Sequence, residues 1–204
     1  MSATTEFHVH HDSPEQIGRR ERLGVRLLIV ADGAFVFGMI FSYFYLRNLN
    51  ANNGWIPEGG HTLSAMSGWI TVFPLIAAAL THRLGSRNIV AFKNIAPITF
   101  IVLIFGLYLQ WRQLAHMPFQ VAGEKEGEHI FGFEGAYSSS WVLIAGANMF
   151  HYILGSFIAL GLFIRARRTK IDPVLEQWRM ATASSWFTWI AISGIACALT
   201  TSVL

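Results

Sequence analysis

Five long apolar stretches, separated by short polar segments, dominate the sequence. They cover approximately residues 23–47, 65–85, 92–112, 139–165 and 182–204. A helix needs about 20 consecutive apolar residues to cross the hydrocarbon core of a bilayer, so each stretch predicts one transmembrane helix. The connections are too short to form a soluble domain between the helices. We therefore predict an all-α polytopic membrane protein, with a polar tail at residues 1–22 and a single five-helix domain at 23–204.

Composition supports a membrane location. Hydrophobic residues make up 53% of the chain and charged residues only 13%, whereas soluble domains carry about 25% charged residues. The chain has one cysteine, Cys197, so an intrachain disulfide is excluded. Basic residues lie beside the apolar stretches, where anionic lipid headgroups are a simpler partner than nucleic acid.

The charged residues alternate from one connection to the next. The N-terminal segment and the second and fourth connections are basic: Arg19, Arg20, Arg22, Arg26; Arg83, Arg87, Lys93; Arg165, Arg167, Arg168, Lys170, Arg179. The connection 48–64 contains no lysine or arginine, and the third is rich in glutamate. With five helices, all basic segments fall on one side of the membrane. The positive-inside rule makes that side cytoplasmic and places the C-terminus outside.

Few ionisable residues lie deep within the apolar stretches, and such residues are functional candidates by default. Asp32 is the only acid well inside a stretch, about 14 Å of helix rise from Leu23. Two interpretations stay open: a carboxylate that handles protons or contacts a partner, or an acid that is hydrogen-bonded to a neighbouring helix or protonated and has only a packing role. His151 lies three residues after Asn148 on the same helical face. We expect both to be polar helix-packing residues, with no metal or haem bound by this chain.

Three residues near the ends of the predicted helices are candidates for the membrane interface. Trp55 and Trp111 have amphipathic rings, which favour the headgroup region. Gln110 precedes Trp111, where it could contact a lipid headgroup or cap the helix.

Several short motifs together suggest a family. The stretch 136–139 reads Ala-Tyr-Ser-Ser, 146–151 reads Gly-Ala-Asn-Met-Phe-His, and Gly155 follows. The stretch 31–38 reads Ala-Asp-Gly-Ala-Phe-Val-Phe-Gly, 55–57 reads Trp-Ile-Pro, and 110–111 reads Gln-Trp. This combination resembles subunit III of the haem-copper oxidases (cytochrome c oxidase) in its short five-helix bacterial form. The sequence is that of a divergent member: Asp32 and Gln110 replace family glutamates, and Asn148 replaces the first of two histidines. The last apolar stretch reads Trp-Phe-Thr at 186–188, without the acid that follows in the family.

The resemblance implies a non-catalytic accessory subunit in a bacterial plasma membrane. Such a subunit packs on subunit I, beside subunits II and IV, and sustains turnover and proton uptake. Haem and copper are then held by the partners. The family fold implies that the first two helices splay from a three-helix bundle, with phospholipid in the V-shaped cleft. Asp32 is then a successor of the family glutamate near that cleft, and a candidate for contact with the lipid or a partner. Alternatives are a subunit III-like component of a quinol oxidase or nitric oxide reductase, or a standalone proton channel or transporter.

Overall fold

The computed structural model describes residues 12–119, 135–168 and 172–202. Within these ranges the chain forms five α-helices and one short 3-10 helix. The helices are α1 (Pro14–Leu49), η1 (Ala51–Asn53), α2 (Ala65–Gly85), α3 (Ile89–Ala115), α4 (Gly135–Ala166) and α5 (Pro173–Thr201). All five α-helices are long and apolar enough to cross a membrane. The prediction of an all-α polytopic protein with five transmembrane helices is therefore confirmed.

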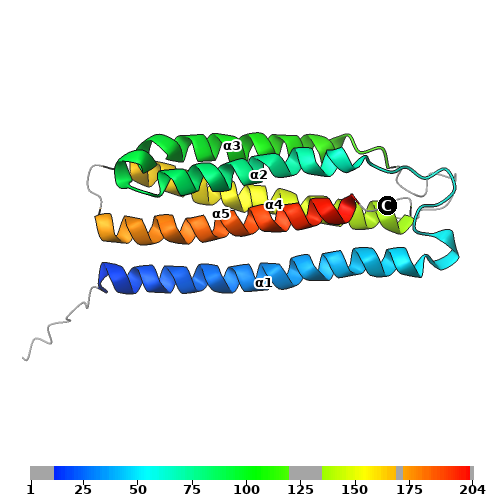
Figure 1. Ribbon diagram of the computed structural model, residues 1–204, viewed down its shortest axis with the longest axis horizontal. Helices are drawn as coiled ribbons and strands as arrows, with labels where there is room; N and C mark the ends of the chain where they lie inside the picture. Colours follow the sequence, from blue (N-terminus) through cyan, green and yellow to red (C-terminus); the bar gives the residue numbers. More distant parts are fainter. Residues whose placement is uncertain (1–11, 120–134, 169–171, 203–204) are drawn as a thin grey trace, which may run out of the picture.

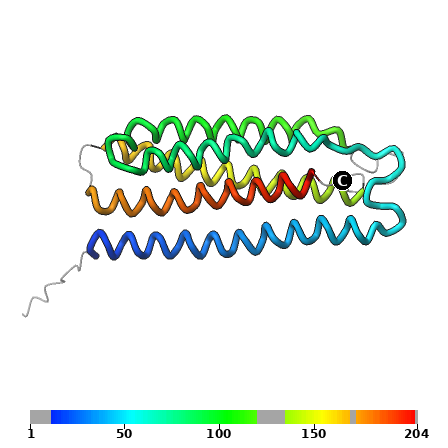
Figure 2. The backbone as a smooth tube through the Cα atoms, viewed as in Figure 1, coloured from blue at the N-terminus to red at the C-terminus, as the bar shows by residue number. Residues whose placement is uncertain are grey.

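The α-helices run side by side as an elongated bundle with alternating directions (Figure 1). The backbone passes along the bundle five times, so the start of α1 and the end of α5 lie at opposite ends (Figure 2). One end of the bundle contains the start of α1, the α2–α3 turn, the end of α4 and the start of α5. We call this the basic end, because the basic segments of the sequence gather there.

The first helix is longer than its apolar stretch. Ser13 and Gln16 form a reciprocal capping box in front of α1, and Pro14 occupies its first turn. These caps satisfy N–H groups that have no partner within the helix, so α1 starts nine residues before the predicted position 23. Residues 14–22 of the predicted tail are thus helical, while residues 1–11 lie outside the described residues. The 36 residues of α1 span about 54 Å at 1.5 Å each.

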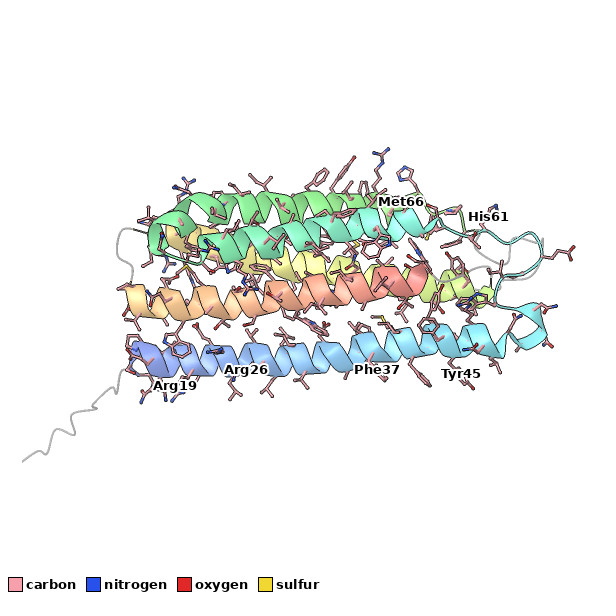
Figure 3. All side chains as sticks on the ribbon, in the orientation of Figure 1. Arg19, Arg26, Phe37, Tyr45, His61 and Met66 are labelled. Carbon is pink, nitrogen blue, oxygen red and sulfur yellow. The ribbon has the colours of Figure 1, made fainter. Side chains whose placement is uncertain are left out.

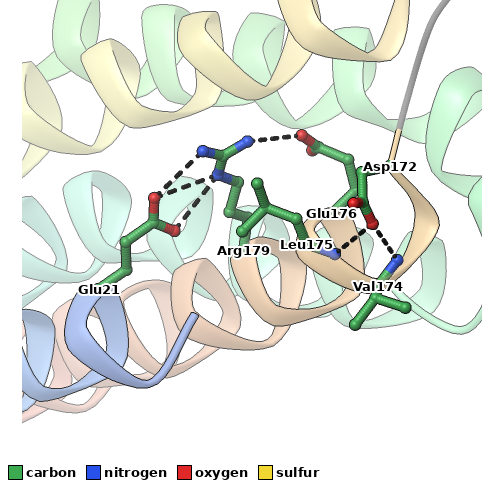
Figure 4. Close-up of polar contacts among 6 residues, drawn as sticks. All are labelled: Glu21, Asp172, Val174, Leu175, Glu176 and Arg179. Carbon is green, nitrogen blue, oxygen red and sulfur yellow. Dashed lines mark hydrogen bonds and ion pairs between the residues drawn. The ribbon is translucent and has the colours of Figure 1, made fainter. Parts of the chain in front are cut away.

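The last helix also starts earlier than its apolar stretch. The Asp172 side chain accepts hydrogen bonds from the backbone N–H groups of Val174 and Leu175, and Pro173 begins the helix (Figure 4). The sequence prediction began at 182 because Glu176 and Arg179 lower the local hydropathy. Polar residues at a well-capped helix start do not prevent helix formation. The other three helices start and end within four residues of their predictions, and α2 matches its prediction of 65–85.

The helices do not divide into the expected two-helix and three-helix units. The second helix packs on α3 and α5, while α1 packs on α5 and, less extensively, on α4. Small residues allow the close contacts: a Cβ atom on Gly106 of α3 would lie 2.1 Å from the Tyr152 ring of α4. A Cβ on Gly85 of α2 would lie 2.9 Å from Ile95 of α3. Because α2 is held in this way, it forms one unit with α3, α4 and α5, and α1 lies along α5.

The end opposite the basic end holds a buried aromatic cluster. The Trp55 ring lies 4.9 Å from that of Tyr43 and 5.6 Å from that of Tyr137. Backbone hydrogen bonds from Ala136 to Gly54 and from Tyr137 to Trp55 tie the start of α4 to the α1–α2 connection. Trp55 is only 7% exposed. Its predicted role at the lipid interface is therefore replaced by a place in the core.

The outer surface of the bundle is strongly apolar. Phe37 and Tyr45 lie on the side of α1 that faces away from the other helices (Figure 3), and they are 70% and 55% exposed. Large apolar side chains are also exposed along the other four helices. Apolar surface of this extent is unfavourable in water but suits a lipid environment. The helix lengths and this surface define a multi-pass membrane protein.

Candidate functional site

The main buried polar site lies where α1, α4 and α5 meet. Asp32 of α1, His151 of α4 and Trp189 of α5 form a cluster that we call the Asp32 site. His151 Nε2 lies 3.0 and 3.1 Å from the two carboxylate oxygens of Asp32. Trp189 Nε1 donates a hydrogen bond of 2.6 Å to one of them. Three helices that are distant in sequence thus converge on one carboxyl group.

The Asp32 site is shielded from the surroundings. The His151 side chain is 2% exposed and that of Asp32 is 9% exposed. When Asp32 is ionised it can only accept hydrogen bonds, so His151 Nε2 then carries a proton. The same proton can reside on the carboxyl group with Nε2 as acceptor. The site can therefore hold a proton at either residue within the apolar part of the bundle.

The other ring nitrogen of His151 faces α5. Ser193 Oγ lies 3.5 Å from His151 Nδ1 and donates a hydrogen bond to the backbone oxygen of Ile190. The Trp186 ring packs edge-on against the imidazole, with 6.2 Å between the ring centroids. These contacts fix the ring plane of His151, so that Nε2 stays directed at Asp32.

A groove of about 430 Å³ passes beside the Asp32 site. It is lined by Asp32, Phe35, Val142, Leu143, Gly146, Ala147, Phe150 and His151. Its walls reach the outer surface, where Phe35 and Phe150 are 52% and 55% exposed. In the described part of the chain, no atom beyond the adjoining backbone of α4 lies within 4 Å of a Cβ placed on Gly146. A lipid chain or a side chain of a partner helix therefore has space to approach the buried carboxylate.

A second polar cluster lies farther from the basic end of the bundle than the Asp32 site does. Asn148 Nδ2 donates to Gln110 Oε1 at 2.8 Å, and Gln110 Nε2 donates to Gln113 Oε1 at 2.8 Å. Gln113 Nε2 donates to the backbone oxygen of Ser67 at 2.7 Å. We call this series the amide chain. Gln110 is 1% exposed, so it neither contacts lipid headgroups nor caps α3 as the sequence suggested, but joins α3 to α4.

The predicted site residues thus separate into two clusters. Asn148 and His151 lie on consecutive turns of α4, yet Asn148 contacts α3 and His151 contacts α1. Trp111 is 53% exposed on α3, so its predicted interface position stays a prediction. Sequence reasoning did not identify Trp189, which lies among other aromatic and apolar residues. Gln113 follows Gln110 by three residues, and this helical spacing could have suggested their contact.

An ion cluster lies at the basic end. The Arg179 guanidinium bonds to Glu21 of α1 and to Glu176 of its own helix (Figure 4). The N–O distances of the two ion pairs are 3.2 and 2.9 Å. The cluster borders a largely apolar cavity of about 660 Å³ between α1, α4 and α5, which Arg165 also lines. This cluster joins α1 to α5 at Glu21, about six helical turns before Tyr43 of the aromatic cluster.

The fold and the polar clusters define a multi-pass helical membrane protein with a buried polar site between α1, α4 and α5. Among the residues that the structure describes, no three histidine, cysteine, aspartate or glutamate side chains gather as a metal-binding group. The predictions of no metal or haem in this chain stay predictions. No protein-family model matches the sequence, and no curated protein matches it.

Proposed function

We propose that this chain is a non-catalytic accessory subunit of a respiratory haem-copper terminal oxidase in a bacterial plasma membrane. The observation that carries the proposal is the contact between Asp32 and His151. These residues belong to two motifs that resemble those of oxidase subunit III, and they lie 119 positions apart in sequence. Their convergence on one buried site supports reading the two motifs as parts of one functional unit.

The orientation proposed for this subunit follows from its charges. The basic end carries the arginines of the N-terminal segment and of the second and fourth connections. The positive-inside rule places this end in the cytoplasm and the end of α5 outside. The Asp32 site then lies within the membrane, and the ion cluster of Arg179 lies toward the cytoplasmic leaflet.

The partner in this proposal is oxidase subunit I, which holds the haem and copper, with subunits II and IV beside it. The groove at Gly146 offers a suitable place for a helix of subunit I, because close helix packing in membranes uses small residues. A partner helix seated there covers the exposed rings of Phe35 and Phe150. It also brings the Asp32 carboxyl group close to the catalytic subunit, where it can support proton uptake and sustained turnover.

Phospholipid is the second proposed ligand. The cavity bordered by Arg165 and Arg179 has apolar walls and a charged rim, which suits an acyl chain with its phosphate at the cytoplasmic surface. This cavity lies between α1, α4 and α5. The family resemblance instead implies a lipid cleft between two splayed helices and the remaining three-helix bundle. The lipid would help to keep α1 against the bundle.

Purification in mild detergent tests the proposed function. Tagged wild-type chain should copurify with a haem-bearing membrane protein, and the isolated chain should show no stoichiometric haem absorbance. Gly146→Leu should abolish this copurification while the variant remains folded, because the side chain fills the docking groove. Gly38→Leu is the matched control and should retain the partner, because among the described residues nothing lies within 4 Å of a Cβ on Gly38 and it lines neither the groove nor the lipid cavity. Stoichiometric haem on the isolated chain, or no haem protein in the complex, contradicts the proposal.

A proton channel is the second candidate, and the buried Asp32–His151 pair is the observation that favours it. A channel would conduct protons without a partner. Liposomes that contain only this chain should show no proton flux above protein-free liposomes under the accessory-subunit proposal. Flux that disappears in Asp32→Asn would favour the channel instead. A subunit III-like role beside a quinol oxidase or a nitric oxide reductase is distinguished by the substrate that the copurified complex consumes.

A further inference from the structure

The amide chain has a fixed direction, because one end of it is a backbone carbonyl. The oxygen of Ser67 can only accept, so Gln113 must present its NH₂ group there and its Oε1 to Gln110. Gln110 must then present its own Oε1 to Asn148. Asn148 consequently uses its NH₂ group toward Gln110, and its Oδ1 atom points away from the chain.

The last oxygen of the chain has no partner within the part of the protein that the structure describes. Asn148 is 6% exposed, and its Oδ1 atom is buried without a hydrogen bond. A Cβ atom placed on Gly194 of α5 would lie 3.6 Å from Oδ1, so this oxygen faces α5. An unpaired buried amide oxygen costs about 1–3 kcal/mol, and native structures usually supply a donor.

A small cavity lies at this position. Its volume is about 20 Å³, and Asn148 and Gly194 both line it. Thr71 and Thr201 are also on its wall. Their hydroxyl groups donate to backbone oxygens of Gly68 and of the α5 turn before Thr201. Each hydroxyl oxygen therefore keeps lone pairs available, and the wall offers three acceptors on α2, α4 and α5.

We infer that this cavity binds one ordered water molecule, which donates to Asn148 Oδ1 and to a threonine hydroxyl oxygen. The volume matches a single water, which needs at least about 10–15 Å³ and two to four polar partners. A metal cation would also interact with these oxygens, but none of the described residues that line the cavity is acidic. An uncompensated charge among apolar residues is far more costly than a neutral donor.

The water would extend the amide chain beyond Asn148. Ser67 and Thr71 lie on α2, Gln110 and Gln113 on α3, Asn148 on α4 and Thr201 on α5. With the water in place, the hydrogen bonds run without a break from the Ser67 carbonyl to a water that lies beside α5. The site is independent of the proposed oxidase function, because it depends only on residues inside this chain.

Crystals of the wild-type full-length chain in a lipid phase, diffracting to better than about 2 Å, test the inference directly. We expect one peak of water-like density within hydrogen-bonding distance of Asn148 Oδ1. Asn148→Leu should remove the peak, because the isosteric side chain has no acceptor. Asp32→Asn is the control and should retain the water peak, because Asp32 belongs to α1 and contacts α4 at His151, away from the cavity. A wild-type cavity without density overturns the inference, and this result does not depend on whether Asn148→Leu folds.

Exchange of sodium for choline distinguishes water from a cation. The melting temperature of the wild-type chain in detergent should be the same in sodium chloride and choline chloride at equal ionic strength. A higher melting temperature in sodium, together with short metal–oxygen distances in the density, would overturn the water in favour of a bound cation.

Discussion

The two polar clusters of α4 differ in charge and in the helices that they join. His151 contacts an aspartate on α1, whereas Asn148, one turn earlier, contacts the neutral Gln110 on α3. The neutral cluster joins helices that already pack closely through Gly106 and Tyr152. The Asp32 site joins a helix that has few buried residues of its own: Gly18, Val36, Met39 and Tyr43.

This difference indicates where polar contacts matter most in the bundle. The unit formed by α2, α3, α4 and α5 is held mainly by close packing, and its amide chain joins helices that already pack on one another. The first helix depends on polar groups for a larger share of its attachment. An accessory subunit that exchanges contacts with a partner along α1 would benefit from such an arrangement.

Loss of the Asp32 carboxyl group should have the largest effect. Asp32→Ala leaves the Trp189 N–H and the His151 ring without their buried partner. We expect destabilisation of about 3 kcal/mol, measured by reversible unfolding in mixed micelles. Asp32→Asn retains an acceptor and should lose less than half as much. Equal stability of the alanine variant and wild type would show that the site does not hold α1 in place.

The variant Gly106→Ala tests the tight packing between α3 and α4. The new Cβ would lie 2.1 Å from the Tyr152 ring, so α3 and α4 must separate, at a cost of about 2 kcal/mol. Gly146→Ala is the matched control on α4, because none of the described residues outside its own helix turn lies within 4 Å of its Cβ. The control should be as stable as wild type or slightly more stable, since alanine favours a helix. Thermal unfolding in detergent would compare the two, and similar losses would contradict the difference in packing.

A smaller effect is expected from the indole hydrogen bond. Trp189→Phe removes the donor to Asp32 but keeps most of the ring, and should destabilise the protein by about 1 kcal/mol. Combination with Asp32→Ala forms a double-mutant cycle. The tryptophan substitution should have little additional effect once the carboxyl group is absent, and full additivity would argue against this hydrogen bond.

The ion cluster at the basic end should contribute least. Glu21→Gln weakens the pair with Arg179, whose side chains are 35% and 21% exposed. We expect a loss of less than about 1 kcal/mol, which shrinks further in high salt because the charges are screened. Melting temperatures at low and high salt measure this. A loss that is unaffected by salt would show that the pair acts through packing.

Much of the fold could be predicted from the sequence, because membrane helices are marked by their apolar lengths. The number of transmembrane helices, their order in the chain and the positions of Asp32 and His151 well inside them followed from hydropathy alone. The contact between these residues did not, since hydropathy contains no information on which helices are neighbours. The expected pairing of α1 with α2 was wrong for the same reason.

The errors on single residues have a common physical cause. Gln110 and Trp55 were placed at the interface because they lie near helix ends. Their burial depends on partners elsewhere in the chain, Asn148 for the amide and Tyr137 for the indole. Nearness to a helix end could be judged from the sequence, but the direction of a side chain, toward the core or away from it, could not.

The long sequence separation within the Asp32 site has a consequence for biosynthesis. Asp32 precedes His151 by 119 residues and Trp189 by 157. At about 5–20 residues per second of translation, its carboxyl group waits roughly 6–30 seconds for these partners. During that time an unpaired aspartate disfavours insertion by about 2.5–3.5 kcal/mol. The many leucine, valine and phenylalanine residues around it in α1 must offset this cost while α1 is still alone in the bilayer. The apolar character of α1 is therefore a requirement of the order of assembly as well as of the finished bundle.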